Sequence, residues 1–167
     1  MDKDIWEKAK EIYNISGCNV AATLSVRRIV NGSVKCDFDV DLAYRKFINM
    51  ISRKMYGRNK GNLKNICFRE YGLSKGLHLH AMLEIPMAKF SCFNDIASFI
   101  EDIWCKQSVA YTNTKKIMDE CGKISYIKNG ARDFHVEEIF DDKGWLNYCC
   151  KNNFNIDNVI NVAASFR

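Results

Sequence analysis

Hydrophobic and polar residues alternate along several short segments of the chain, and this alternation predicts strands. In NVAATLSVRRIV, residues 19–30, a half-buried strand is predicted, because the apolar Val20, Ala22, Leu24 and Val26 alternate with Thr23, Ser25 and Arg27. NLKNICFREYG (62–72) and GLHLHAMLEIP (76–86) are predicted to be two strands joined by a short loop. DFHVEEIF (133–140) is expected to be a further strand, and residues 107–132 could contain strand fragments.

Other segments carry apolar residues at helical spacing. Helices are predicted over residues 2–13, about 39–56, 91–107 and 141–154. Their expected capping residues are Asp39 or Asp41, Ser91 or Asn94, and Asp141 or Asp142. Adjacent strands joined by short turns and separated by helices favour an α+β domain, with helices packed on an antiparallel sheet.

Composition supports one ordinary globular domain spanning residues 1–167, with 154–167 as a tail or linker that packs or frays. Hydrophobic residues make up 47% and charged residues 27% of the chain, with a single proline. The eight cysteines include no C-x-x-C pair, and neither a leader peptide nor a membrane span is recognisable. We therefore expect reduced thiols and a cytoplasmic protein.

The formal net charge of +5 is small, but basic residues concentrate in SRKMYGRNKGNLK, residues 52–64. This stretch contains no acidic residue and could contact a nucleic-acid backbone, or it could be a solvated helix end and loop. The candidate DNA-binding residues are Arg53, Lys54, Arg58, Lys60 and Lys64.

Two of the three histidines stand in GLHLHAMLEI, separated by one leucine. Residues two apart in a strand share a face, so His78 and His80 would project together, with Cβ atoms roughly 7 Å apart. A hairpin would place Glu70 roughly opposite one of them, although the register is open. Two imidazoles and a carboxylate suit a catalytic metal ion with open coordination positions. Alternatively, they are exposed side chains on a solvated sheet.

A second pattern lies near the C-terminus, where GWLNYCCKNNF places Tyr148 and Lys151 three residues apart on a predicted helix. Such residues share a helix face. Alone, a Tyr-x-x-Lys pair is usually a surface feature.

The order and spacing of these motifs resemble those of the HUH endonucleases, in particular the rolling-circle replication initiator (Rep) proteins. ATLSV (22–26) is similar to the first motif, GLHLHAMLE (76–84) with the upstream Glu70 to the metal motif, and YCCK (148–151) to the nucleophile motif. The first motif departs from the family pattern at Ala22 and Ser25, and only one tyrosine lies in the last. The resemblance covers roughly residues 19–153.

The resemblance implies a central antiparallel sheet of about five strands flanked by helices. It implies Glu70, His78 and His80 as ligands of Mg²⁺ or Mn²⁺, and Tyr148 as the nucleophile. Lys151 would stabilise charge on the attacked phosphate. The expected activity is nicking and joining of single-stranded DNA through a 5′-phosphotyrosine, to initiate rolling-circle replication of a plasmid or a small virus or phage.

The expected partners are single-stranded DNA, including an origin hairpin, and a host helicase or polymerase. No membrane association is expected, because the sequence has no apolar run long enough for a membrane helix. No nucleotide cofactor is expected, because the sequence has no G-x-x-x-x-G-K-[ST] motif. The compartment would be a bacterial cytoplasm, or the nucleus for a eukaryotic virus. Two alternatives stay open: a single-tyrosine transposase or relaxase with the same chemistry, and a non-catalytic nucleic-acid-binding module.

Overall fold

The computed structural model describes residues 17–57, 63–72, 76–120, 122–149 and 159–160. In chain order the elements are β1 (Val20–Ser25), β2 (Ile29–Val30), β3 (Ser33–Val34), α2 (Asp37–Tyr56), β4 (Asn65–Gly72), β5 (Gly76–Leu83), η1 (Met87–Lys89), α3 (Phe93–Trp104), β6 (Thr112–Met118), β7 (Ile124–Ala131), β8 (His135–Glu138), α4 (Asp142–Cys149) and β9 (Val159–Ile160). The helix predicted over residues 2–13 lies outside the described residues.

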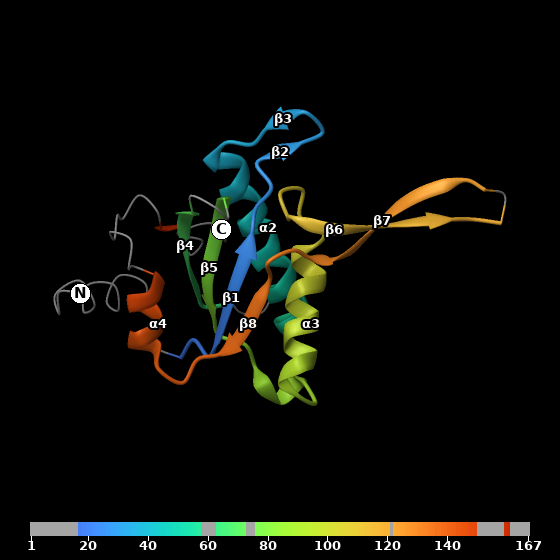
Figure 1. The fold of residues 1–167 in the computed structure, drawn as a ribbon. Helices are drawn as coiled ribbons and strands as arrows, with labels where there is room; N and C mark the ends of the chain where they lie inside the picture. Colours follow the sequence, from blue (N-terminus) through green and yellow to red (C-terminus); the bar gives the residue numbers. More distant parts are fainter. Residues whose placement is uncertain (1–16, 58–62, 73–75, 121, 150–158, 161–167) are drawn as a thin grey trace.

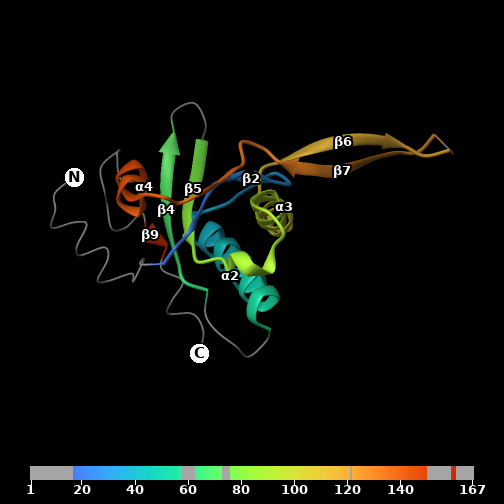
Figure 2. The same cartoon turned by 90° about the horizontal axis from the view of Figure 1, so that it is seen from below.

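An antiparallel sheet with strand order β8-β1-β5-β4-β9 forms the centre of the fold. Four longer strands build it, and the two-residue β9 pairs with Cys67 and Phe68 on β4. Helices α2 and α3 cover one face, and α4 lies against the other (Figures 1 and 2). The predicted α+β class with a central antiparallel sheet flanked by helices is thus confirmed.

Strand periodicity divides the side chains of β5 between these two helical layers. Leu79 and Ala81 belong to the larger buried cluster, which also contains residues of α2 and α3. Met82 belongs to a smaller cluster with Leu146 of α4. Because successive strand residues face opposite sides, His78 and His80 lie on the same face as Met82, beneath α4.

The strand β1 is buried on both faces, and not on one face as predicted. Its alternating pattern predicts one buried face, yet Ala21 and Ser25 on the supposedly exposed face are 0% and 1% exposed. The reason is its position between β5 and β8, with helical layers on both sides of the sheet. Its residues there are small, so they fit under a covering layer.

The helix α2 begins earlier than predicted. Cys36 is its N-cap, and the backbone N–H of Cys36 donates to the Asp39 carboxylate at 3.0 Å, so Asp39 supports the first turn from inside the helix. The buried face of α2 carries Val40, Ala43, Tyr44, Phe47, Ile48, Ile51, Ser52 and Met55. The helix ends at Gly57, whose φ of 81° favours glycine.

The helix α3 packs beside α2 and has Cys92 as its N-cap, between the two predicted caps Ser91 and Asn94. Ile96, Ile100, Ile103 and Trp104 are buried along one side. The Trp104 ring meets Phe47 of α2 edge-on, with centroids 5.4 Å apart and planes at 84°. Aromatic contacts of this kind add to the apolar burial that holds the two helices together.

The segment 107–132 forms more regular structure than its sequence predicts. Strands β6 and β7 pair with each other as a separate two-stranded ribbon, with a register irregularity between Thr112 and Thr114. The ribbon extends away from the body of the protein in both views (Figures 1 and 2). At its base, the backbone N–H of Ala131 donates to Glu101 of α3 at 2.7 Å.

No helix in the described part of the chain is long and apolar enough to cross a membrane. Of the predicted tail 154–167, only residues 159–160 are described, and they form β9.

Candidate active site

The β4–β5 hairpin sets the position of the three predicted metal ligands. In its register Glu70 pairs with His78, while Phe68 and Thr23 flank His80 from the two neighbouring strands. Because Glu70 and His78 are directly opposite, their side chains share a face of the sheet. The structure therefore brings Glu70, His78 and His80 together beneath α4.

The His80 imidazole is held at both of its nitrogens. Its Nε2 lies 2.6 Å from Oε2 of Glu70, and its Nδ1 lies 3.2 Å from the hydroxyl oxygen of Thr23. In the neutral ring, an Nε2 proton donated to the carboxylate leaves Nδ1 to accept from the Thr23 hydroxyl. His80 is also 2% exposed, so its ring is fixed by packing and by two partners.

His78 is also buried, at 5% exposure, but is held less completely. Its Nδ1 lies 3.3 Å from the carbonyl oxygen of Gly76. Its Nε2 is fully enclosed and has no hydrogen-bond partner in the described structure. A buried polar atom without a partner costs about 1–3 kcal/mol, so such an atom indicates a ligand or a functional constraint.

The donor types fit a divalent cation, and the buried Nε2 of His78 is a nitrogen available to one. Their present geometry is that of a hydrogen-bonded network, because the Glu70 carboxylate is engaged by His80. Across the described residues, no three His, Cys, Asp or Glu side chains surround a common point as metal ligands would.

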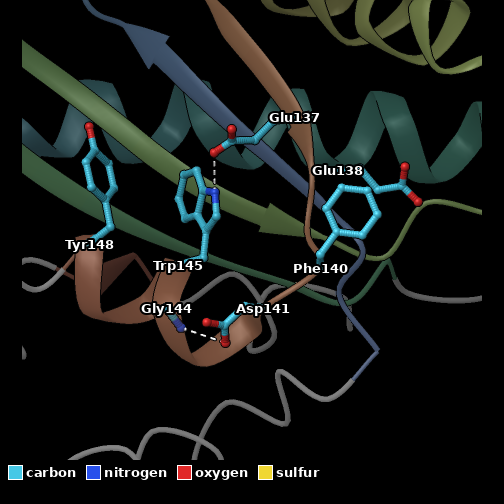
Figure 3. Close-up of a pocket in the computed structure, with 7 residues that line it drawn as sticks. All are labelled: Glu137, Glu138, Phe140, Asp141, Gly144, Trp145 and Tyr148. Atoms are coloured by element: carbon cyan, nitrogen blue, oxygen red, sulfur yellow. Dashed lines mark hydrogen bonds between the residues drawn. The ribbon is translucent and has the colours of Figure 1, made fainter.

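Tyr148 lies directly against this network. Its ring meets the His80 imidazole at 90°, with centroids 5.5 Å apart, and meets Trp145 at 5.7 Å and 61°. The residue remains 49% exposed. Figure 3 shows its ring extending from α4 toward the sheet. The predicted nucleophile is thus accessible and next to the paired histidines.

Helix α4 is anchored by residues that precede Tyr148. Leu146 is fully buried in the smaller hydrophobic cluster, and the Trp145 indole N–H donates to Glu137 of β8 (Figure 3). At the start of α4 the Asp141 carboxylate accepts from the backbone N–H of Gly144 at 2.9 Å, as one of the two predicted caps. A Cβ at Gly144 would come too close to that carboxylate, which would have to move to accommodate a side chain there.

An open pocket of about 390 Å³ lies beside Tyr148 (Figure 3). It is lined by Glu137, Glu138, Phe140, Asp141, Gly144, Trp145 and Tyr148. Three of these residues are acidic and three are aromatic. Three carboxylates would repel a phosphate, so the pocket favours an uncharged or cationic group over the backbone of a nucleic acid.

Of the other predicted site residues, those that the structure describes are not gathered at this place. Lys151, Arg58 and Lys60 lie outside the described residues. Arg53 and Lys54 are exposed in the last turn of α2, on the opposite side of the sheet from the histidines. Lys64 precedes β4 at the end remote from Glu70, about 20 Å along the strand. The basic stretch therefore stays a prediction of a separate nucleic-acid contact.

The candidate site includes two residues that the sequence analysis did not assign to it. His135 pairs with Thr23 in the register of β8, and Glu137 pairs with Ala21, so both face α4. His135 Nε2 lies 3.4 Å from the Glu137 carboxylate. Their two-residue spacing in DFHVEEIF was the available signal, but only the pairing of β8 with β1 puts them on this face.

Comparisons with protein-family models, with curated proteins and with solved structures find no match to this chain.

Proposed function

We propose that the protein nicks and joins single-stranded DNA through a covalent link to Tyr148, as an initiator of rolling-circle replication of a plasmid or a small virus or phage. The observation that carries the proposal is the contact between the Tyr148 ring and His80, 5.5 Å between centroids. It joins two sequence motifs that lie far apart along the chain. An accessible phenol beside two histidines and a carboxylate is a suitable arrangement for phosphodiester transfer.

The roles of the individual residues follow from the chemistry. Glu70, His78 and His80 would hold a Mg²⁺ or Mn²⁺ ion, which supplies charge stabilisation at the scissile phosphate. The Tyr148 oxygen forms a bond to phosphorus while the bond to the 3′ oxygen breaks. The phenol loses a proton and the departing 3′ oxygen gains one. Lys151 would add a positive charge near the attacked phosphate.

The products explain why this chemistry can be reversed. A 5′-phosphotyrosine and a free 3′-hydroxyl result, and the new phosphodiester to tyrosine replaces the broken one. Rejoining is attack of a 3′-hydroxyl on that link, which needs no nucleotide cofactor. Nicking and joining are therefore two directions of one reaction.

Burial and exposure support this division of roles. The two histidines are 5% and 2% exposed, so they are held rigidly, as ligands should be. Tyr148 is about half exposed and can meet a polymer that approaches from solvent. A substrate as large as DNA requires such an open site.

The test is formation of a covalent adduct. The full chain is incubated with Mn²⁺ and labelled single-stranded oligonucleotides, including hairpins, and run on a denaturing protein gel. We expect a protein band shifted by the attached DNA, which disappears with Tyr148→Phe and persists with Tyr56→Phe. An unchanged adduct in Tyr148→Phe would rule out this nucleophile.

The hydrogen bond from His80 to Glu70 favours one second candidate, a nucleic-acid-binding module without catalysis. In that case the carboxylate and imidazole only stabilise the sheet. DNA binding would then be strongly salt-dependent, with no adduct under any divalent ion. If adducts form, strand transfer on transposon ends would distinguish a transposase from a replication initiator.

A further inference from the structure

A second open pocket, of about 610 Å³, lies at one end of the central strands. It is lined by Val26, Arg27, Arg28, Ile29, Gly76, Leu77 and Tyr111. Val26 follows the last residue of β1, and its backbone N–H donates to Leu77 of β5 at 3.0 Å. Leu77 precedes His78 on β5 and packs on the α2 and α3 side of the sheet, so the pocket lies at the same end of β5 as His78.

The pocket carries positive charge. Arg27 is exposed, and its side chain has no ion pair or hydrogen bond within the described residues. Arg28 is already paired with Asp37 at 2.6 Å, so much of its charge is balanced. Arg27 is therefore the group best able to bind a phosphate here.

An aromatic ring forms another part of the wall. Tyr111 is partly exposed, and the guanidinium of Arg132 lies over its ring at 4.9 Å from the centroid. The same Arg132 donates to the Tyr111 hydroxyl at 2.7 Å. The ring is thus held in place before any ligand arrives, which lowers the entropic cost of stacking a base on it.

The backbone ties this wall to the active-site strands. The N–H of Tyr111 donates to Ser25 of β1 at 3.1 Å, and the N–H of Arg132 donates to the carbonyl of Tyr111 at 2.7 Å. Ser25 pairs with His78 in the sheet register. Tyr111 is therefore positioned by the same strands that position His78, and not by the protruding ribbon alone.

The two pockets differ in charge. The pocket beside Tyr148 contains Glu137, Glu138 and Asp141, whereas the pocket lined by Leu77 and Tyr111 contains Arg27 and Arg28. A polyanion that has its scissile phosphate at Tyr148 is repelled by the first pocket and attracted by the second. The bound DNA should therefore extend from the catalytic residues toward Arg27.

We propose that the pocket formed by Arg27 and Tyr111 binds one nucleotide of the single-stranded DNA substrate, with its phosphate at Arg27 and its base stacked on Tyr111. This inference rests on the proposed function and adds a second binding position to it. Stacking is largely independent of base identity, so the pocket contributes affinity and direction more than sequence preference.

Binding is measured in the Tyr148→Phe background, which cannot form the proposed link, by fluorescence anisotropy with labelled dT20. Arg27→Gln should weaken binding and reduce the slope of log Kd against log salt by about 0.7, the loss of one phosphate contact. Tyr111→Leu should weaken binding roughly five- to hundredfold, whereas Tyr111→Phe keeps the ring and stays within about threefold.

Arg45→Gln is the matched control, because it removes one exposed positive charge from α2, away from the pocket. The inference is overturned if Arg27→Gln and Arg45→Gln bind dT20 alike, or if Tyr111→Leu binds as tightly as Tyr111→Phe. It is also overturned if Arg27→Gln weakens binding of free dTMP but not of dT20, because the ligand would then be a mononucleotide.

The adduct assay separates this inference from the proposed function. If the protein with Tyr148 forms the covalent adduct while Arg27→Gln and Tyr111→Leu bind dT20 normally, the proposed nicking activity is supported and the pocket assignment is wrong. If both substitutions weaken binding but no adduct forms with Mn²⁺ or Mg²⁺, the pocket assignment is supported and the proposed nicking activity is wrong.

Discussion

The Tyr148 ring stands perpendicular to the His80 imidazole, with 5.5 Å between the ring centroids. The tyrosine comes from α4 and the histidine from the central strand β5. Trp145, one turn earlier on α4, contacts both rings. The distance between the nucleophile and the paired histidines therefore depends on how α4 is docked on the sheet.

Replacing Trp145 by phenylalanine should disturb that docking. The ring contacts are largely kept, but the indole N–H that binds Glu137 is lost. A small displacement of a reacting group can reduce a rate by up to about a hundredfold. We expect the single-turnover rate of adduct formation to fall about ten- to hundredfold, with the Kd for dT20 changed less than about threefold. A parallel rise in Kd would instead indicate a general loss of structure.

Replacing Glu70 by glutamine should weaken divalent-ion binding. The substitution keeps the size of the side chain but removes the negative charge, so Mn²⁺ affinity should fall at least about tenfold. The Mn²⁺ affinity is measured from the paramagnetic broadening of the His78 and His80 ring signals in NMR spectra during a Mn²⁺ titration. Glu84→Gln is the matched control, since Glu84 follows β5 at the end opposite His78. Equal effects of both substitutions would remove Glu70 from the ligand set.

The two histidines should respond in opposite ways to replacement by leucine. His78→Leu removes a buried nitrogen that has no partner, so stability should rise by about 1 kcal/mol. His80→Leu leaves Glu70 and Thr23 without this partner, so stability should fall by about 1–3 kcal/mol.

Urea denaturation in the presence of EDTA measures both changes without a contribution from bound metal. Both variants should fail to form the DNA adduct. A destabilised His78→Leu protein would mean that the contact of Nδ1 with Gly76, or a partner of Nε2 in solution, stabilises the fold by more than the buried Nε2 costs.

The ion pair between Arg69 and Asp41 should be important for attaching α2 to β4. Arg69 donates to both carboxylate oxygens, and the side chains are 10% and 26% exposed. Arg69→Met leaves a mostly buried carboxylate unpaired, so it should destabilise the fold by about 2–4 kcal/mol. Arg28→Met, which breaks the more exposed pair with Asp37, should cost less than about 1 kcal/mol. Thermal unfolding of the two variants compares them, and equal losses would contradict the burial argument.

The first turn of α2 should be sensitive to acid. The backbone N–H of Cys36, and then its thiol, hydrogen-bond the Asp39 carboxylate and lower its pKa. The ionised form is therefore favoured in the folded state. Its contribution to stability is present above the ordinary carboxyl pKa and is lost as the pH falls through the lowered one.

Asp39→Asn tests this by comparison with the unmodified protein. The variant should be less stable near neutral pH, and the difference should disappear toward pH 2. The difference in stability between the two proteins is measured from thermal unfolding curves, recorded by circular dichroism at pH values from 2 to 7. A difference that stays constant across this range would assign the effect to packing and not to ionisation.

The sequence alone determined the elements that depend on local periodicity and turn chemistry. The strands β4 and β5, their short connection and the common face of His78 and His80 follow from a two-residue period, which is independent of the rest of the fold. The helices α2, α3 and α4 follow from apolar residues at helical spacing. The starts of α2 and α3 were not predicted, because their N-caps are cysteine residues, at positions 36 and 92.

Only the tertiary structure decided which of these elements meet. Helix α4 covers the face of the sheet that carries the histidines. Glu70 pairs with His78 in the register but hydrogen-bonds His80, and Tyr111 lines a pocket together with Arg27. Each of these is a contact between different segments of the chain. No local pattern encodes them, because they depend on how whole strands and helices pack. The residue types are written in the sequence, but their convergence is a property of the packed sheet and its two covering layers.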